Sequence, residues 1–172
     1  AHNEPMTDGS QAAKPSIVWL RRDLRLADSA ALAAALEHRE PVQPVFVFDR
    51  TILDPLPSRA DRRVQFIWHA LTELDQALRE RGGRLIVLDG DPGELIPALA
   101  NRLEAARVIC AQDYEPQAIA RDQAVAATLA ADGRCFDQVT DHVLVDPRAL
   151  LTGKGTPYTV YTPYRKRWQA DA

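Results

Sequence analysis

The chain has 172 residues and a formal net charge of −3, from 21 Lys and Arg against 24 Asp and Glu, which is the size of one ordinary domain. This slightly acidic balance argues against a strongly basic nucleic-acid binder, because phosphate neutralisation needs Lys and Arg clustered on one face. The two cysteines form neither a disulfide framework nor a zinc pattern. We expect Cys110 and Cys135 to be small buried hydrophobic residues on neighbouring strands.

The chain shows no targeting or membrane segment. No apolar run approaches the length of about 20 residues that a membrane helix needs, and no signal-peptide core precedes the first strand. We therefore expect a soluble, cytoplasmic protein. Residues 1–15 are largely polar and aperiodic, and they predict a disordered leader.

From Ile17 onward, short apolar runs alternate with longer helical patterns, which is typical of βαβ units around a parallel sheet. Five strands are predicted, at 17–20, 42–49, 85–88, 107–111 and 134–138.

The first two predicted helices follow strands one and two. Asp28 is the expected N-cap of a helix over 30–37. The second helix, near 61–81, ends at Gly82 and carries an apolar stripe that faces the sheet. The stripe consists of Val64, Ile67, Leu71, Leu74 and Leu78.

The third and fourth predicted helices begin at similar signals. Asp91 caps the third, with a proline in its first turn; its buried face is Leu95, Leu99 and Leu103. The fourth runs over 116–131 and stops at Gly133. Its inward residues are expected to be Ile119, Val125, Ala126 and Leu129.

The connections between strands determine the predicted topology. Crossovers between parallel strands are right-handed, so helices cover both faces of the sheet only if the winding reverses. The expected fold class is α/β, a Rossmann-like doubly wound five-stranded parallel sheet of order 3-2-1-4-5. This order places the carboxyl ends of strands one and four side by side, with a ligand crevice between them.

Several kinds of site are not supported. No strand is followed by a G-x-G-x-x-G or G-x-x-x-x-G-K-[ST] run. The four histidines are scattered without a second metal ligand at helical spacing, and no catalytic triad or nucleophile elbow is visible. We therefore assign no catalytic and no metal-binding residue.

The predicted crevice collects polar side chains from three loops. These are 21–23 after strand one, 49–63 after strand two and 111–116 after strand four. The carboxylates of Asp113 and Glu115, near arginines and a helix N-terminus, suit a planar heteroaromatic ligand with ring N–H donors and an anionic edge, such as a flavin or a pterin.

Structural roles for the same residues remain open. The positive N-terminal end of the following helix would also stabilise the negative charge of Glu115, and Asp113 would serve as a turn residue. The arginines at 21, 22 and 25 would lock a loop through bidentate pairs with aspartate, and Arg63 would lie on a solvated face where a helix begins.

The run WLRRDLRLAD at 19–28 resembles the opening of the DNA photolyase/cryptochrome family. Further segments fall in the order expected for the amino-terminal domain of that family. They are Phe48-Asp49, Gly90-Asp91-Pro92, Gln112-Asp113-Tyr114-Glu115 and the segment from Tyr158 to Tyr164.

The resemblance implies a light-harvesting antenna domain at 16–140. Its chromophore is methenyltetrahydrofolate, a deazaflavin or, in some members, a flavin such as FMN. Glu115 falls where folate-binding members use a glutamate, whereas Asp113 and Arg63 resemble positions used by deazaflavin-binding members. Phe48 and Asp49 lie on the pocket wall in both kinds, and Arg21 completes the candidate set. An aspartate at 113 favours deazaflavin.

The resemblance also implies a partner domain. Residues 141–172 would begin a linker to a helical domain that binds FAD and DNA, so this chain alone is expected to be unable to repair cyclobutane pyrimidine dimers. The alternatives are the same domain of a cryptochrome photoreceptor and a free-standing nucleotide-binding module.

Overall fold

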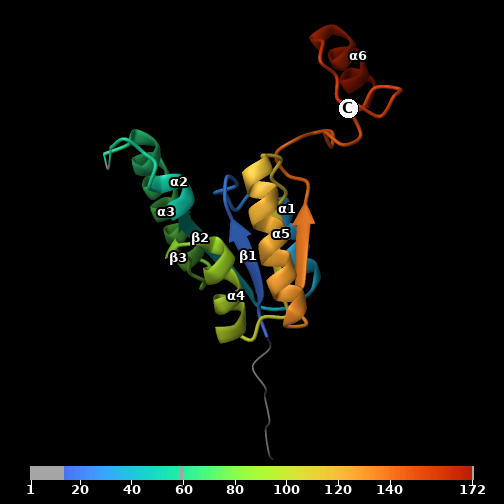
Figure 1. Ribbon diagram of the computed structural model, residues 1–172. Coiled ribbons are helices and arrows are strands. Elements are labelled where there is room, and N and C mark those ends of the chain that lie inside the picture. The colour runs from blue at the N-terminus through green and yellow to red at the C-terminus, as the bar shows by residue number, and fades with distance from the viewer. Residues whose placement is uncertain (1–13, 59, 172) are drawn as a thin grey trace, which may run out of the picture.

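The computed structural model describes residues 14–58 and 60–171, so the predicted leader lies outside the described residues as far as residue 13. Five parallel strands form one sheet in the order β3-β2-β1-β4-β5, as the sequence predicted (Figure 1). The strands are β1 (Ser16–Leu20), β2 (Val42–Asp49), β3 (Ile86–Gly90), β4 (Arg107–Ala111) and β5 (Cys135–Val139).

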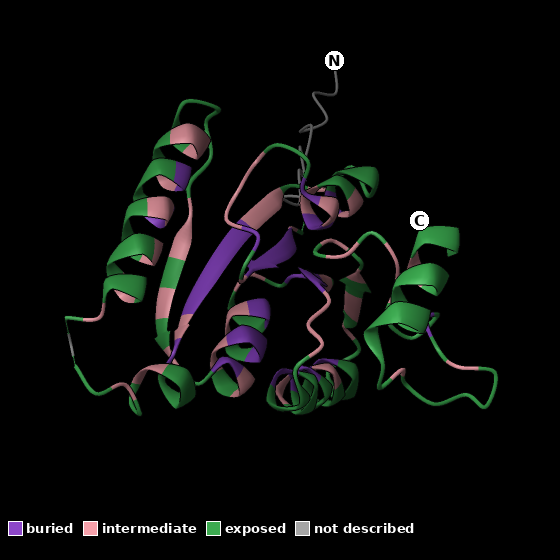
Figure 2. Ribbon diagram, turned by 90° about the horizontal axis from the view of Figure 1, so that it is seen from above, coloured by how far each residue is buried: buried purple, intermediate pink, exposed green. Residues whose placement is uncertain are grey.

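Six helices belong to the described residues, two more than predicted. They are α1 (Ala30–Glu37), α2 (Arg50–Leu53), α3 (Arg62–Arg79), α4 (Pro92–Arg102), α5 (Pro116–Ala131) and α6 (Tyr161–Asp171). The short α2 and the C-terminal α6 were not predicted, because neither has a long apolar stripe. α6 stands apart from the sheet, and its residues are almost all exposed (Figures 1 and 2).

The core has two layers, one on each face of β1. All five residues of β1 are buried, and their side chains alternate between the faces. Ile17 and Trp19 pack in the cluster formed with α4 and α5, and Val18 and Leu20 in the cluster formed with α1 and α3. Burying the side chain of Ile17, Val18 or Leu20 contributes about 1.5–3 kcal/mol each. The central strands are the most buried part of the molecule (Figure 2).

Several predicted element boundaries needed correction, among them those of β5, predicted at 134–138 and observed at Cys135–Val139. Ser29, and not Asp28, is the N-cap of α1, since its side chain accepts from the backbone N of Leu32; Asp28 adopts a left-handed conformation with φ of 52°. Strand β3 begins after Leu85, because the Leu85 amide donates to Asp75 at 2.8 Å, and it extends to Gly90, which pairs with Asp49 of β2.

Two burial predictions were wrong. Ile119 is 41% exposed, because the inward face of α5 consists of Ala118, Asp122, Val125 and Leu129. Cys135 is exposed at the start of the edge strand β5, whereas Cys110 is buried in β4. Burial raises the pKa of the Cys110 thiol to about 12.

Substituting a core residue of α5 tests the packing of the layer formed by α4 and α5. Leu129 is fully buried, so Leu129→Ala is expected to lower the free energy of unfolding by about 2–5 kcal/mol through lost burial and a residual cavity. Urea denaturation measures the change. Leu36→Ala on α1, where the side chain is 64% exposed, is the matched control and is expected to change stability by less than about 0.5 kcal/mol; equal losses would contradict the layer assignment.

Candidate functional site

A cleft of about 1270 Å³ lies at the carboxyl ends of the strands, on the side where β1, β2 and β4 meet the N-terminal turns of α4 and α5. The reversal of winding between β1 and β4 opens the sheet at this point. All six residues predicted from the sequence line this single cleft. They are Arg21, Phe48, Asp49, Arg63, Asp113 and Glu115.

The floor of the cleft is an ion-pair network centred on Asp122 of α5, whose side chain is 2% exposed. Arg21 Nη1 donates to both Asp122 carboxylate oxygens at 2.7 Å, and Arg121 donates to Asp122 Oδ1 through Nε at 3.1 Å and Nη2 at 2.9 Å. Arg121 Nη1 also lies 3.6 Å from Asp49 Oδ2. We call Arg21, Asp49, Arg121 and Asp122 the floor network.

The buried Trp19 ring joins the floor network to the core. The guanidinium carbons of Arg21 and Arg121 lie 4.8 and 4.9 Å from the centre of the Trp19 ring, within the range of cation–π attraction. Arg21 also donates through Nη2 to the carbonyl of Ala111 at the end of β4. These contacts hold the ends of β1 and β4 and the helix α5 in one arrangement.

The carboxylates at the rim of the cleft are paired with Arg22. Arg22 Nη2 donates to Glu115 Oε1 at 2.7 Å, which raises the pKa of the guanidinium, and Arg22 Nε lies 3.6 Å from Asp113 Oδ2. Asp113 Oδ1 accepts from the backbone N–H of Tyr114 at 2.8 Å and of Glu115 at 3.4 Å. Burial alone would raise the pKa of Asp113, but Arg22 and the two amides together lower it below the usual range.

Glu115 occupies the N-cap position of α5 without making a side-chain capping hydrogen bond. Its carboxylate is therefore engaged by Arg22 and not by the helix amides. Asp113, in contrast, does have the turn role considered from the sequence, because its Oδ1 accepts from the two following amides.

An aromatic cluster forms the opposite wall of the cleft. The rings of Phe46 and Phe48 meet edge to face, with centroids 5.1 Å apart, and Trp68 of α3 stacks on Phe48 at 6.5 Å with an interplanar angle of 23°. Trp68 is 60% exposed, so it is a surface residue packed against the wall. Ile67 and Leu53 add aliphatic surface to the cleft.

The remaining two predicted residues have local partners. Asp49 is the N-cap of α2, and its Oδ1 accepts from the backbone N of Thr51 at 2.9 Å. Arg63 is exposed and pairs with Asp61 through Nε at 3.0 Å and Nη2 at 2.7 Å, and these hydrogen bonds lower the pKa of Asp61 to about 2.

Sequence reasoning missed three lining or supporting residues: Trp19, Arg121 and Asp122. A signal for Asp122 was present, because positions 118, 122, 125 and 129 are spaced four, three and four apart on one helical face. A carboxylate within such an otherwise apolar face indicates a buried ion pair. Assigning Ile119 to that face concealed this signal.

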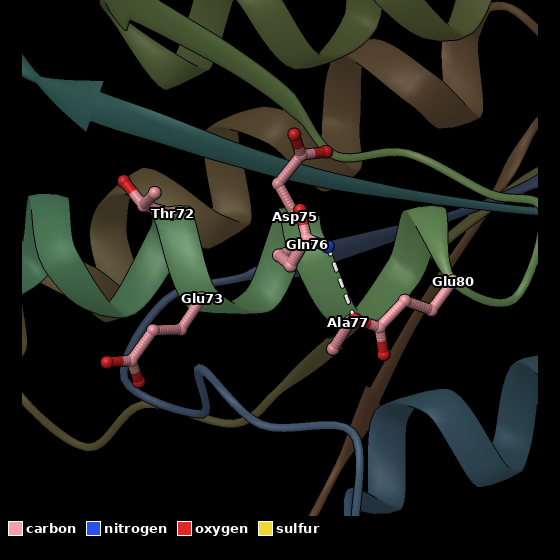
Figure 3. A pocket seen from close by; sticks show the side chains of 6 residues that line it. All are labelled: Thr72, Glu73, Asp75, Gln76, Ala77 and Glu80. Carbon is pink, nitrogen blue, oxygen red and sulfur yellow. Dashed lines mark hydrogen bonds between the residues drawn. The ribbon is translucent and has the colours of Figure 1, made fainter.

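A second pocket, of about 510 Å³, lies on α3 away from the cleft (Figure 3). Five of its six lining residues belong to α3, namely Thr72, Glu73, Asp75, Gln76 and Ala77, and the sixth, Glu80, is the C-cap of that helix. Gln76 donates to Glu80 at 3.2 Å within this set. Because a single exposed helix face supplies neither a second wall nor a ring-stacking surface, this pocket offers less for recognition than the cleft.

Residues 14–58 and 60–171 contain neither a metal-binding cluster nor a membrane-spanning helix. Within these ranges, no group of three or more His, Cys, Asp and Glu side chains is arranged to hold a metal ion. In the same ranges, no helix combines the length and apolar character needed to cross a bilayer.

The fold and the cleft define a doubly wound α/β domain with a cleft at its topological switch point, where such folds commonly bind ligands. The chain belongs to the DNA photolyase family, whose sequence model matches residues 16–172. It is 42% identical over 159 residues to a deoxyribodipyrimidine photo-lyase of Synechococcus sp., an alignment that covers 92% of this chain and 33% of that protein.

Solved photolyases share the fold. A class III photolyase from Agrobacterium tumefaciens superposes with a TM-score of 0.84 at 32% identity, over 98% of this chain and 34% of the other. A photolyase from Sulfolobus tokodaii, described as containing two FAD molecules with the implication of a novel light-harvesting cofactor, gives a TM-score of 0.73 at 31% identity, over 81% and 32% of the two chains. This chain therefore spans about a third of the length of these relatives.

The lowered pKa of Asp113 predicts a pH-dependent contribution to stability. Because the folded protein binds fewer protons than the unfolded chain around the ordinary pKa of 3.8, the contribution is present near neutral pH. It is lost as the pH falls through 3.8 and the lower folded-state value. Asp113→Asn, which keeps an acceptor for the amides but loses the charge facing Arg22, is expected to cost about 1 kcal/mol at pH 7.

Urea unfolding of both proteins between pH 7 and pH 2.5 measures this difference, which should shrink towards zero at the acid end. Glu73→Gln on the exposed face of α3 is the control. A difference that stays constant with pH would contradict the charge assignment.

Proposed function

We propose that this chain is the antenna-chromophore domain of a light-driven DNA repair enzyme of the photolyase family, and that the cleft is its chromophore site. The observation that carries the proposal is the convergence of all six predicted residues on one cleft with an aromatic wall. Family membership supports it. The bound chromophore would absorb light and pass the excitation to FAD elsewhere in the longer protein.

The residues fit a planar heteroaromatic ring. Phe46 and Phe48 offer an apolar surface in which the two rings meet edge to face, and aromatic rings prefer stacked or edge-to-face neighbours. The carboxylates of Asp113 and Glu115 supply acceptors for ring N–H groups, and both are paired with Arg22. Arg63 lies at the exposed end of the cleft, where it would face an anionic group of the ligand.

Three chromophore classes remain candidates: a deazaflavin, methenyltetrahydrofolate and a flavin such as FMN. The aspartate at position 113 favours the deazaflavin, by resemblance to members that use this position. The Sulfolobus tokodaii photolyase with two FAD molecules makes a flavin the second candidate. In every case, residues 16–140 would form the antenna domain, and the segment after 140 would lead to a helical FAD domain.

Chromophore retention tests the proposal. The purified chain is incubated with each of the three chromophores, desalted and examined by absorbance, and the dissociation constant of the retained one is determined by titration. Asp113→Ala and Glu115→Ala are each expected to weaken binding roughly 10- to 100-fold, the equivalent of losing a hydrogen bond to a charged group.

Asp132→Ala, at the far end of α5, is the matched control and should leave binding unchanged. Failure of all three chromophores to bind, or wild-type affinity in both cleft variants, would refute the site assignment. FAD content and dimer repair by the full-length gene product then distinguish a photolyase from a cryptochrome.

A further inference from the structure

Asp122 lies beneath the proposed chromophore cleft and touches every charged group of its floor except Asp49. It accepts from Arg21, from Arg121 and, through Oδ2, from Gln138 Nε2 of β5 at 2.9 Å. Its exposed fraction of 2% means that no ligand in the cleft reaches the carboxylate easily. Its effect on a ligand would be transmitted through the two arginines.

Around the floor, carboxylates outnumber guanidinium groups. Two guanidinium groups, of Arg21 and Arg121, face the two carboxylates of Asp49 and Asp122. Asp23, fully buried beside this group, adds a further carboxylate whose Oδ1 accepts from the Arg21 amide at 2.9 Å. The floor therefore presents no uncompensated cation, even though two arginines line it.

We propose that Asp122 is a positioning and specificity-determining residue, which holds Arg21 and Arg121 on the Trp19 ring and cancels their charge so that the cleft floor rejects anionic groups. This inference rests on the proposed function in one respect, namely that the cleft receives a chromophore. An uncharged ring edge would then meet the floor, and any phosphate or carboxylate tail would remain at the outer end, near Arg63.

An engineered cysteine in the lining can report the charge of the floor. Ala124 lies one helical turn after Arg121, lines the cleft and is exposed, and Ala124→Cys is combined with Cys135→Ser because Cys135 is also exposed. The rate of alkylation by iodoacetate, an anion, divided by the rate with neutral iodoacetamide reports the local charge, because access and thiol ionisation affect both rates alike. Both rates are measured at constant ionic strength without any chromophore, so the result is independent of whether the cleft binds one.

In this background, Asp122→Asn is expected to raise the ratio of the two rates about threefold, because removing one negative charge from the floor makes the local potential more favourable to anions. Asp132→Asn, just after the end of α5, is the matched control and should leave the ratio unchanged. An unchanged ratio in Asp122→Asn would overturn the proposal, and this includes an equal rise of both rates, which indicates only that the structure has opened.

Arg21→Met provides the reverse test and keeps the proposal falsifiable if Asp122→Asn does not fold. It leaves the floor more negative by one charge, so the ratio of the iodoacetate rate to the iodoacetamide rate is expected to fall about threefold. A ratio at the original value would show that these paired charges do not set the potential of the floor, and the proposal would be wrong.

Discussion

The buried ion pair between Arg21 and Asp122 is the interaction on which the cleft depends. Arg21 follows β1, and Asp122 lies in the second turn of α5, so the pair crosses the point where the winding of the sheet reverses. Removing one partner of such a buried pair typically costs about 3–5 kcal/mol, because the other charge is left without compensation. The pair therefore fixes the spacing between β1 and α5, and with it the width of the cleft.

Charge pairing extends from the floor to the rim, and this determines what kind of ligand the cleft can recognise. Arg22 neutralises Glu115 and approaches Asp113, while Arg63 is engaged by Asp61. Exposed pairs of this kind are worth at most about 1 kcal/mol, so a ligand group can replace one partner at small cost. The buried pair of the floor offers no such exchange. Recognition by polar groups is thus confined to the rim, and the interior selects by shape and stacking.

The topology and the cleft were predictable because they follow from periodicity and from one rule of chain geometry. The apolar runs of β1 and β4 and the stripe of α3 identified the layers, and the order 3-2-1-4-5 then placed Arg21 and Asp113 near one another. The partners of each charge were not predictable. Glu115 pairs with Arg22, and Asp49 and Asp122 both pair with Arg121. These pairings depend on how far each side chain reaches across neighbouring elements, and the local sequence pattern does not encode that reach.

Hydrogen bonds tie the start of the predicted linker, 141–172, to the domain. The Asp141 carboxylate accepts from the amide of Ala30 at 3.0 Å and from Arg25 at 2.9 Å. Burial opposes ionisation of Asp141, but these hydrogen bonds outweigh it and lower the pKa of the carboxyl.

Further along, Arg148 donates to Gln112 at 3.2 Å, and Leu150 is buried. The predicted linker therefore contacts Gln112, which directly follows β4 and precedes Asp113 of the cleft rim. Its first residues are thus tied to the domain by side-chain hydrogen bonds, whereas α6 at its end stands apart from the sheet (Figure 1).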